Sequence, residues 1–310
     1  MVTFKHVLYP TDLSDASRSA IPYAAAMARW YGAQLTVLHA VPTFEPIPIP
    51  SDRIGTPTSL VAPPTREAVE AEVRDWLGSS AFEGLKTVVL AMAGDPVRVI
   101  ADECIADAVD LIVMGTHGRR GFDRLLSGSV TERVLRASPC PVLAVPPGLD
   151  IASGATAVFH RVLCPVDFSA SSRRALDIAL DLARQSNGTV SVITVIEWLA
   201  EEEPRATAHF NVSEYRQHLL EDTRARLHAL LSEEARTWCD INEIVTFGRA
   251  HRKVLRLAAE ERCDLVVMGA QGRGGATLAF FGSTTPLVVR SATAPVLVVR
   301  SPAASTSGAS

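Results

Sequence analysis

The chain has 310 residues, of which 47% are hydrophobic and 21% charged, and its formal net charge is −4. This is an ordinary globular composition, and the length favours two domains of about 150 residues each. The acidic balance matches a nucleic-acid backbone poorly, so we expect no nucleic-acid partner. No stretch reaches the ~20 apolar residues of a membrane span, and the first residues lack the apolar core of a signal peptide. We therefore expect a cytoplasmic protein that binds no membrane.

The five cysteines are odd in number and contain no C-x-x-C pair. A disulfide framework and a structural zinc site both need paired or regularly spaced cysteines. We expect buried free thiols, and no metal site formed by the protein itself.

Short β-branched runs alternate with amphipathic stretches along the first half. The expected strands are Val7–Tyr9, Gln34–His39, Thr87–Ala91, Leu111–Met114 and Val142–Val145. The expected helices are Ser17–Tyr31, Thr65–Trp76, Pro96–Val109 and Ser129–Ala137. Continuous apolar runs are typical of strands covered on both faces. The alternation predicts right-handed βαβ units and a doubly wound parallel sheet.

Two connections interrupt this alternation. The segment from Pro42 to Pro64 is rich in proline and can be neither helix nor central strand. It is longer than most loops that have no function, so both interpretations, a mobile lid and a passive surface loop, stay open. The second half has a shorter acidic segment around Glu201–Pro204, followed by an expected helix from Ser213 to about Ala235. The tail Ser301–Ser310 is expected to be disordered.

The chain carries the same pattern twice. Asp110–Gly115 reappears as Asp264–Gly269, with an offset of about 154 residues. Val7–Ser14 reappears as Val162–Ser169, and the terminal runs Pro141–Val145 and Pro295–Val299 also match. A nearly constant offset over a whole half predicts duplication of a complete domain rather than a solenoid. We expect domains at 1–147 and 158–301, joined by a linker near Pro146 to Ala157.

The most informative motif is a glycine pattern, G-x2-G-x9-G-[ST], that occurs once in each half. Its members are Gly115, Gly118, Gly128 and Ser129, and then Gly269, Gly272, Gly282 and Ser283. At a glycine frequency of ~7%, one such match arises by chance roughly once in a hundred chains of this length. Two matches in the same register of two repeats are not accidental.

The position of the motif predicts an anion site. Gly115 follows an expected strand at its carboxyl end, where doubly wound sheets bind ligands. Glycines there let the backbone approach a phosphate closely, and Ser129 opens a helix whose free N–H groups favour an anion. The alternative is that the glycines serve only tight turns.

An aspartate follows the first strand of each half, Asp12 after Pro10 and Asp167 after Pro165. A carboxylate at this place can accept hydrogen bonds from ribose hydroxyls. The alternative is that the aspartate is the N-cap of the next helix, a role that Ser14 or Ser17 can fill instead.

The P-T-D-x-S run after the first strand, the glycine motif and the final P-V-L-x-V strand together resemble the universal stress protein family, over nearly the whole chain and twice. The resemblance implies two tandem five-stranded parallel sheets of order 3-2-1-4-5, an adenine nucleotide-binding, Rossmann-like α/β fold. It implies that the glycine motif binds the phosphates of ATP, or of ADP or AMP, that the aspartate holds ribose, and that the end of the second strand contacts adenine.

By position, this resemblance predicts a nucleotide site in each half. The expected binding residues are Pro10, Thr11, Asp12, Ala40, Met114, Gly115, Gly118, Arg119, Gly128, Ser129 and Val130 in the first half, and Asp167, Val195, Gly269, Gly272, Gly282, Ser283 and Thr284 in the second. The terminal strand pairs two domains in this family, so we expect the two halves to form a pseudo-dimer related by a twofold axis. Whether two chains also form a homodimer stays open.

The second half departs from the pattern at three positions. Gln271 replaces the basic His117, and Thr284 replaces the apolar Val130. Pro286 replaces Glu132, which removes the capping box that Ser129 and Glu132 predict in the first half. We expect the first half to be the better nucleotide site.

The sequence contains no P-loop lysine motif and no G-x-G-x-x-G after a strand. Candidate cations near the phosphates are Arg119, Arg124, His117 and a Mg²⁺ ion, but no general base is evident. The first hypothesis is therefore a nucleotide-responsive regulatory module with an unidentified protein partner and little or no hydrolysis. The alternative is a slow ATPase or autophosphorylating enzyme. A third interpretation is an assembly scaffold that binds no ligand.

Overall fold

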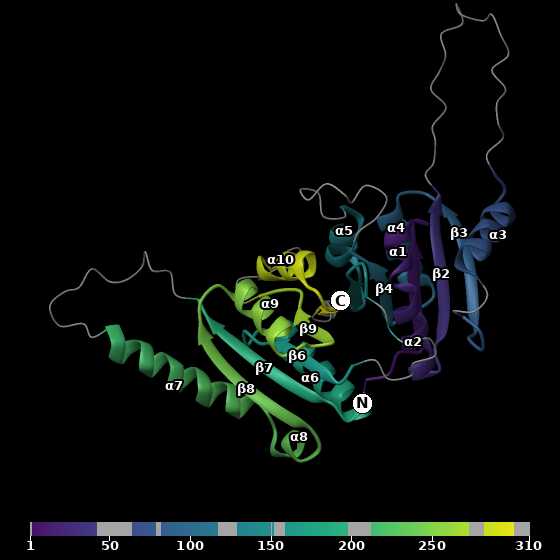
Figure 1. The fold of residues 1–310 in the computed structure, drawn as a ribbon. Coiled ribbons are helices and arrows are strands. Elements are labelled where there is room, and N and C mark those ends of the chain that lie inside the picture. Colours follow the sequence, from purple (N-terminus) through teal and green to yellow (C-terminus); the bar gives the residue numbers. More distant parts are fainter. Residues whose placement is uncertain are drawn as a thin grey trace, which may run out of the picture.

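A computed structural model describes residues 2–41, 64–78, 82–116, 129–149, 151, 159–197, 212–272 and 282–300. Its centre is one ten-stranded sheet of order β3-β2-β1-β4-β5-β10-β9-β6-β7-β8 (Figure 1). The strands are β1 His6–Thr11, β2 Gln34–Val41, β3 Thr87–Ala93, β4 Leu111–Gly115, β5 Val142–Val145, β6 Arg161–Pro165, β7 Thr189–Ile196, β8 Asp240–Phe247, β9 Leu265–Gly269 and β10 Val296–Val299. Each half has the order 3-2-1-4-5, which confirms the predicted fold class.

Helices cover both faces of the sheet. They are α1 Asp15–Arg18, α2 Ile21–Tyr31, α3 Arg66–Leu77, α4 Pro96–Ala106, α5 Ser129–Ala137, α6 Ala170–Ser186, α7 Val212–Leu230, α8 Glu233–Trp238, α9 Ala250–Glu260 and α10 Thr284–Ser291. One core lies between the sheet and α2, α3, α6, α7 and α8. The other lies between the sheet and α4, α5, α9 and α10. Each core runs through both halves, so burial of apolar surface holds the two repeats together.

The two halves meet at their terminal strands. β5 and β10 pair antiparallel, with Leu143 opposite Leu297, whereas every other pair of strands in the sheet is parallel. This confirms the predicted internal pairing, which leaves neither terminal strand as an open edge. Several hydrogen bonds outside the sheet also cross between the halves. Arg300 donates to the carbonyl of Ser138 at 3.2 Å, and the backbone N–H of Val2 donates to Asp181 at 2.7 Å.

Two helix predictions were wrong in the same way. The expected helix Ser17–Tyr31 is divided into α1 and α2, because Pro22 lies in the first turn of α2 and has no N–H to donate to the preceding turn. The expected helix Ser213–Ala235 ends at Leu230. Ser232 then accepts a hydrogen bond from the N–H of Ala235 and begins α8. In both cases a proline or a capping serine set the helix boundary, although the hydrophobic periodicity continued across it.

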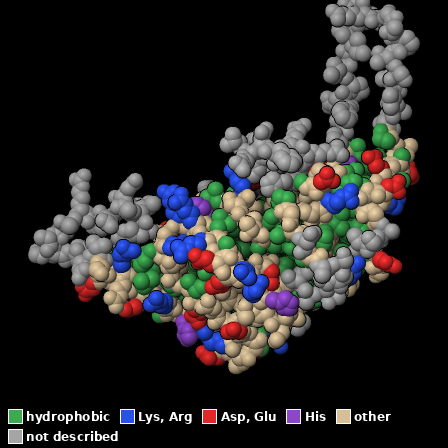
Figure 2. All heavy atoms as spheres, viewed as in Figure 1, with side chains coloured by type: hydrophobic (Ala, Val, Ile, Leu, Met, Phe, Trp, Pro, Cys, Tyr) green, Lys and Arg blue, Asp and Glu red, His purple; other side chains and the backbone are tan. Residues whose placement is uncertain are grey.

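All five cysteines are free and buried, as predicted. In the described part of the chain, no helix is long and apolar enough to cross a membrane, and no cluster of three metal-ligating side chains occurs. The face shown in Figure 2 carries acidic and basic side chains interspersed. Residues 42–63 of the proline-rich segment, the acidic segment Glu201–Pro204 and the tail Ser301–Ser310 lie outside the described residues.

Candidate nucleotide site

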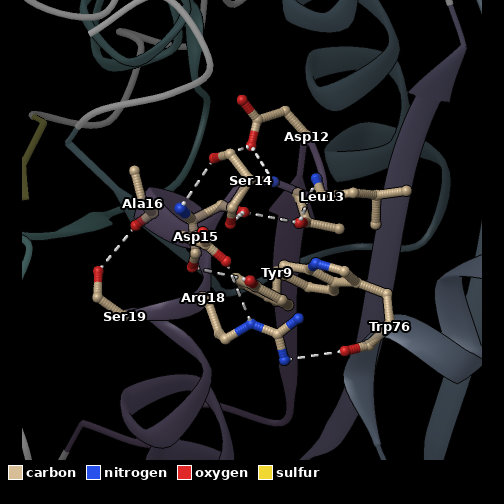
Figure 3. A network of polar contacts seen from close by, with 11 residues as sticks. Tyr9, Asp12, Leu13, Ser14, Asp15, Ala16, Arg18, Ser19 and Trp76 are labelled. Carbon is tan, nitrogen blue, oxygen red and sulfur yellow. Dashed lines mark hydrogen bonds and ion pairs between the residues drawn. The ribbon is translucent and has the colours of Figure 1, made fainter. Parts of the chain in front are cut away.

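The first strand of the first half ends in a tight polar turn (Figure 3). The N–H and the hydroxyl of Ser14 donate to Asp12 Oδ1 at 3.1 and 2.6 Å. The Ser14 hydroxyl oxygen accepts from the N–H of Ser17 at 3.1 Å and so caps α1. Ser14, not Asp12, is therefore the N-cap. The alternative role considered for the aspartate is wrong.

The second half repeats this turn atom for atom. Asp167 Oδ1 accepts from the N–H and the hydroxyl of Ser169 at 3.0 and 2.6 Å, and Ser169 caps α6. The residue between them lies in the left-handed region in both halves, with φ of 60° at Leu13 and 67° at Phe168. Such a backbone costs a non-glycine residue about 1–2 kcal/mol. The left-handed backbone recurs at this position in both repeats, as it also does at Ala108 and Arg262 just before β4 and β9.

A buried polar network supports the turn of the first half. The Tyr9 hydroxyl donates to the Ser17 carbonyl at 2.9 Å, and the hydroxyls of Thr11 and Ser17 lie 3.0 Å apart. The N–H of Leu13 donates to Thr11 Oγ1 at 3.0 Å. Burial raises the pKa of Tyr9 well above its ordinary value, so the phenol stays neutral and keeps its proton for this bond.

The glycines of the second half bring β9, α6 and the first turn together. A Cβ on Gly269 would lie 2.6 Å from Ser171 Oγ and 2.8 Å from the backbone nitrogen of Ser172. Gly269 therefore serves the close approach of α6 to the sheet. A Cβ on Gly272 would lie 3.2 Å from Asp167 Oδ2, so the glycine backbone lies directly beside the carboxylate. A Cβ on Gly282 would meet the backbone nitrogen of Gly272 at 3.4 Å.

Hydrogen bonds fix this glycine corner, which we define as residues 269–272 together with 282–285. The Ser171 hydroxyl donates to the Gln271 carbonyl at 2.6 Å, and the N–H of Gly282 donates to the Ala270 carbonyl at 2.9 Å. Thr285 Oγ1 donates to the Gly269 carbonyl at 2.9 Å. These bonds hold the corner in place before any ligand arrives.

The N-terminus of α10 opens onto the same corner. Ser283 is its N-cap but makes no side-chain capping bond, in agreement with the predicted loss of the capping box. The first-turn N–H groups of an α-helix have no partner inside the helix and attract anions. Pro286, in the first turn of α10, brings no N–H, so this helix offers fewer amide donors than a helix without proline.

A cavity of about 830 Å³ lies at the carboxyl ends of β6, β7 and β9. All seven residues predicted for the second site line it: Asp167, Val195, Gly269, Gly272, Gly282, Ser283 and Thr284. Its apolar wall is formed by Val166, Ile193, Val254 and Met268. Three carboxylates line it, those of Asp167, Glu197 and Asp222, against one guanidinium, that of Arg226, among the described residues. The described charged side chains of the lining are therefore net negative and do not neutralise a triphosphate.

The model of the universal stress protein family matches residues 3–146 and again residues 159–300. The chain belongs to the universal stress protein family. A universal stress protein of Thermus aquaticus is 36% identical over 146 residues, which is 46% of this chain and 98% of the relative. One of Mycobacterium tuberculosis is 28% identical over 302 residues, 95% of this chain and 96% of the relative.

A solved structure has the same tandem extent. The crystal structure of a universal stress protein from Archaeoglobus fulgidus aligns with a TM-score of 0.64 at 25% identity, and the alignment covers 96% of each chain. Two universal stress protein units in one chain are thus a shared arrangement, and not a peculiarity of this sequence.

Within this universal stress protein, the first-half site is described only in part. Pro10 and Thr11 end β1, Ala40 lies near the end of β2, Met114 and Gly115 end β4, and Ser129 and Val130 begin α5. Thr131 Oγ1 donates to the Gly115 carbonyl at 3.0 Å, the counterpart of the bond made by Thr285. Glu132, the predicted capping acid, pairs with Arg136 at 2.8 Å. Gly118, Arg119 and Gly128, like His117 and Arg124, lie outside the described residues.

Sequence reasoning missed one wall of the second cavity. Leu219, Asp222, Thr223 and Arg226 of α7 line it, although the sequence analysis assigned no site residue to this helix. The available signal was their spacing of i, i+3, i+4 and i+7, which places all four on one face of the helix.

Proposed function

We propose that this universal stress protein binds an adenine nucleotide, ATP or its di- or monophosphate, in each half and acts as a nucleotide-responsive regulator of an unidentified protein partner. One observation carries the proposal. Residues from β6–α6, from β7 and from the two sides of the glycine motif bring all seven predicted second-site residues to the wall of one cavity. Its volume of about 830 Å³ lies within the range of about 300–1,000 Å³ of small-molecule sites.

Different regions of the lining suit the base, the ribose and the phosphates of a nucleotide. Val166, Ile193 and Met268 offer an apolar surface for the base beside the end of β7, where Val195 lies. The carboxylate of Asp167, fixed by the Ser169 turn, is placed to accept from ribose hydroxyls. The glycine corner and the first turn of α10 offer backbone amides to the phosphates.

The charge of the lining implies a cation with the phosphates. The carboxylates outnumber the guanidinium in the described lining, and amides alone carry only partial charge. We therefore expect Mg²⁺ to enter as a complex with the phosphate oxygens rather than through a preformed protein site.

Slow hydrolysis is the weaker alternative. In the described lining no lysine or histidine occurs that would act as a general base or neutralise a transferred phosphoryl group. Binding without rapid turnover is the function that these residues support best.

We also propose the domain limits 1–147 and 158–301. The five buried free thiols agree with a reducing, cytoplasmic environment.

Calorimetric titration of the full chain with ATP and Mg²⁺ tests the proposal. The expected result is saturable heat with about tenfold weaker affinity at one site in Asp12→Asn and in Asp167→Asn, and at both sites in the double variant. A matched control is Asp264→Asn at the other end of the sheet, where Asp264 accepts from the N–H groups of His160 and Arg161. Absence of heat with ATP, ADP and AMP at millimolar concentration would refute nucleotide binding.

A further inference from the structure

One face of α7 forms a wall of the second cavity. Leu219, Asp222, Thr223 and Arg226 line it, and three of these four side chains are polar. A helix that covers a core normally turns apolar residues inward. The anchor of α7 is instead the adjacent Leu227, which is 0% exposed. Asp222 and Arg226 are exposed, so this polar stripe is accessible to a ligand in the cavity.

Arg226 is held beside the sugar-binding turn. Its guanidinium carbon lies 4.0 Å from the centre of the Phe168 ring. Phe168 follows Asp167 directly and is itself fixed, with 8% exposure and the left-handed backbone described above. A cation–π contact orients the guanidinium without using its five N–H donors, which remain suited to oxygen acceptors.

Asp222 lies one turn before Arg226 on the same face. Its carboxylate is 3.4 Å from Nε2 of His218, and its side chain is 66% exposed. The face thus presents an acceptor at Asp222, a hydroxyl at Thr223 and a donor at Arg226 to the same part of the cavity. Such a set fits a group rich in hydroxyls rather than a phosphate chain, which would be repelled by Asp222.

We propose that this face of α7 binds the ribose of the nucleotide in the second cavity, with Arg226 donating to a ribose hydroxyl oxygen. The inference rests on the proposed function, since it assigns a further contact to the same ligand. The glycine corner takes the phosphates, so α7 senses whether a complete nucleoside is present. The first half has Leu13 at the position of Phe168 and lacks the ring that holds Arg226. The contact therefore belongs to the second site alone.

The test is amide hydrogen exchange of the full chain, read separately in α7 and in residues 269–272 of the glycine corner. With Mg²⁺ and ATP, exchange is expected to slow in both regions. With Mg²⁺ and pyrophosphate, it is expected to slow in the glycine corner only. With 2′-deoxy-ATP, protection of α7 is expected to need more ligand than with ATP, because one hydroxyl is missing.

Substitutions on α7 make the test specific. Arg226→Ala is expected to raise the ATP concentration needed to protect the glycine corner about tenfold, and to abolish protection of α7 at saturation. Arg226→Lys is expected to fall between this variant and the wild type. Arg216→Ala is the matched control, because Arg216 makes the same kind of ring contact on α7, 4.7 Å from the Phe247 ring, but does not line the cavity.

The outcomes separate the two proposals. Protection of the glycine corner without α7, or equal behaviour of Arg226→Ala and Arg216→Ala, would overturn the role of α7 and leave nucleotide binding intact. Absence of protection in both regions with ATP would overturn the proposed function, and this inference with it.

Discussion

The two halves build the same aspartate turn and support it differently. In the first half, Tyr9 and Thr11 of β1 bond to Ser17, so the turn is tied to its own strand and helix. In the second half, Cys164 and Val166 occupy the matching positions, and Ser171 instead bonds to Gln271 of the glycine corner. Duplication has kept the backbone geometry, while the side chains that hold it have diverged.

This difference has a consequence for ligand binding. In the second half, the Ser171 bond joins the Asp167 turn to the glycine corner, so the contacts that we propose for the ribose and for the phosphates are connected. Ala16 stands at the position of Ser171 in the first half and cannot make that bond. The second half also has α7 over its cavity. We expected the first half to be the better site from its His117 and Val130, and that ranking stays a prediction.

The largest effect is expected from Gly269→Ala. Its Cβ would collide with Ser171 and with the backbone of Ser172, and overpacking of this kind costs about 1–3 kcal/mol. Chemical denaturation should show this loss in the free energy of unfolding. Gly282→Ala is the control, because its nearest neighbour lies at an ordinary 3.4 Å. Equal stability of the two variants would contradict the packing role of Gly269.

A second prediction separates the carboxylate charge from the turn that holds it. Asp167→Asn keeps an oxygen to accept from Ser169 but loses the charge, so stability should change little. ATP affinity at the second site should fall about tenfold, since bonds to charged acceptors are the stronger ones. Asp12→Asn should do the same at the first site only. Unchanged affinity in both variants would mean that the aspartates serve the turn alone.

A third prediction tests the connection between turn and corner. Ser171→Ala removes the bond to the Gln271 carbonyl and should cost about 1 kcal/mol of stability. It should also speed amide exchange across 269–272. Ala16→Ser in the first half is the reciprocal change, and it should leave exchange in the second half unaffected. A rigid glycine corner in Ser171→Ala would show that the bonds of Gly282 and Thr285, together with that of Ser169 to the Gln271 carbonyl, suffice to hold it.

The smallest effect is expected from Phe168→Leu, which gives the second half the residue of the first. It removes the ring below Arg226, a contact of about 0.5–1 kcal/mol at an exposed position. Thermal unfolding should change little, whereas exchange in the last two turns of α7 should accelerate. Unaltered exchange there would show that Leu227 alone holds the helix.

Much of the fold could be predicted from the sequence. The duplicated apolar runs predicted a parallel sheet in each half, and the resemblance to the universal stress protein family supplied the strand order and the pairing of the two halves. Val142–Val145 is the clearest case, since an apolar terminal strand needs a partner. The convergence of Asp167, Gly272 and Ser283 also follows from strand ends meeting at one edge of a parallel sheet.

The helix ends and the caps could not be predicted from the hydrophobic periodicity, because they depend on which nearby proline or capping residue acts. Pro22 and Ser232 ended helices that the apolar pattern would continue. Ser14 rather than Asp12 is the N-cap of α1, because only one of the two suitable side chains can occupy that position. The face of α7 was missed because polar residues over a ligand cavity look like polar residues in solvent.

We propose above all that the glycine corner holds the phosphates, and Asp167 the ribose, of one nucleotide. A crystal structure of the full chain grown with excess ATP and Mg²⁺ tests it most directly. We predict the triphosphate against the amides of residues 269–272 and 282–285, with the ribose at Asp167. A cavity that stays empty at saturating ATP, or a nucleotide bound away from this corner, would contradict the account.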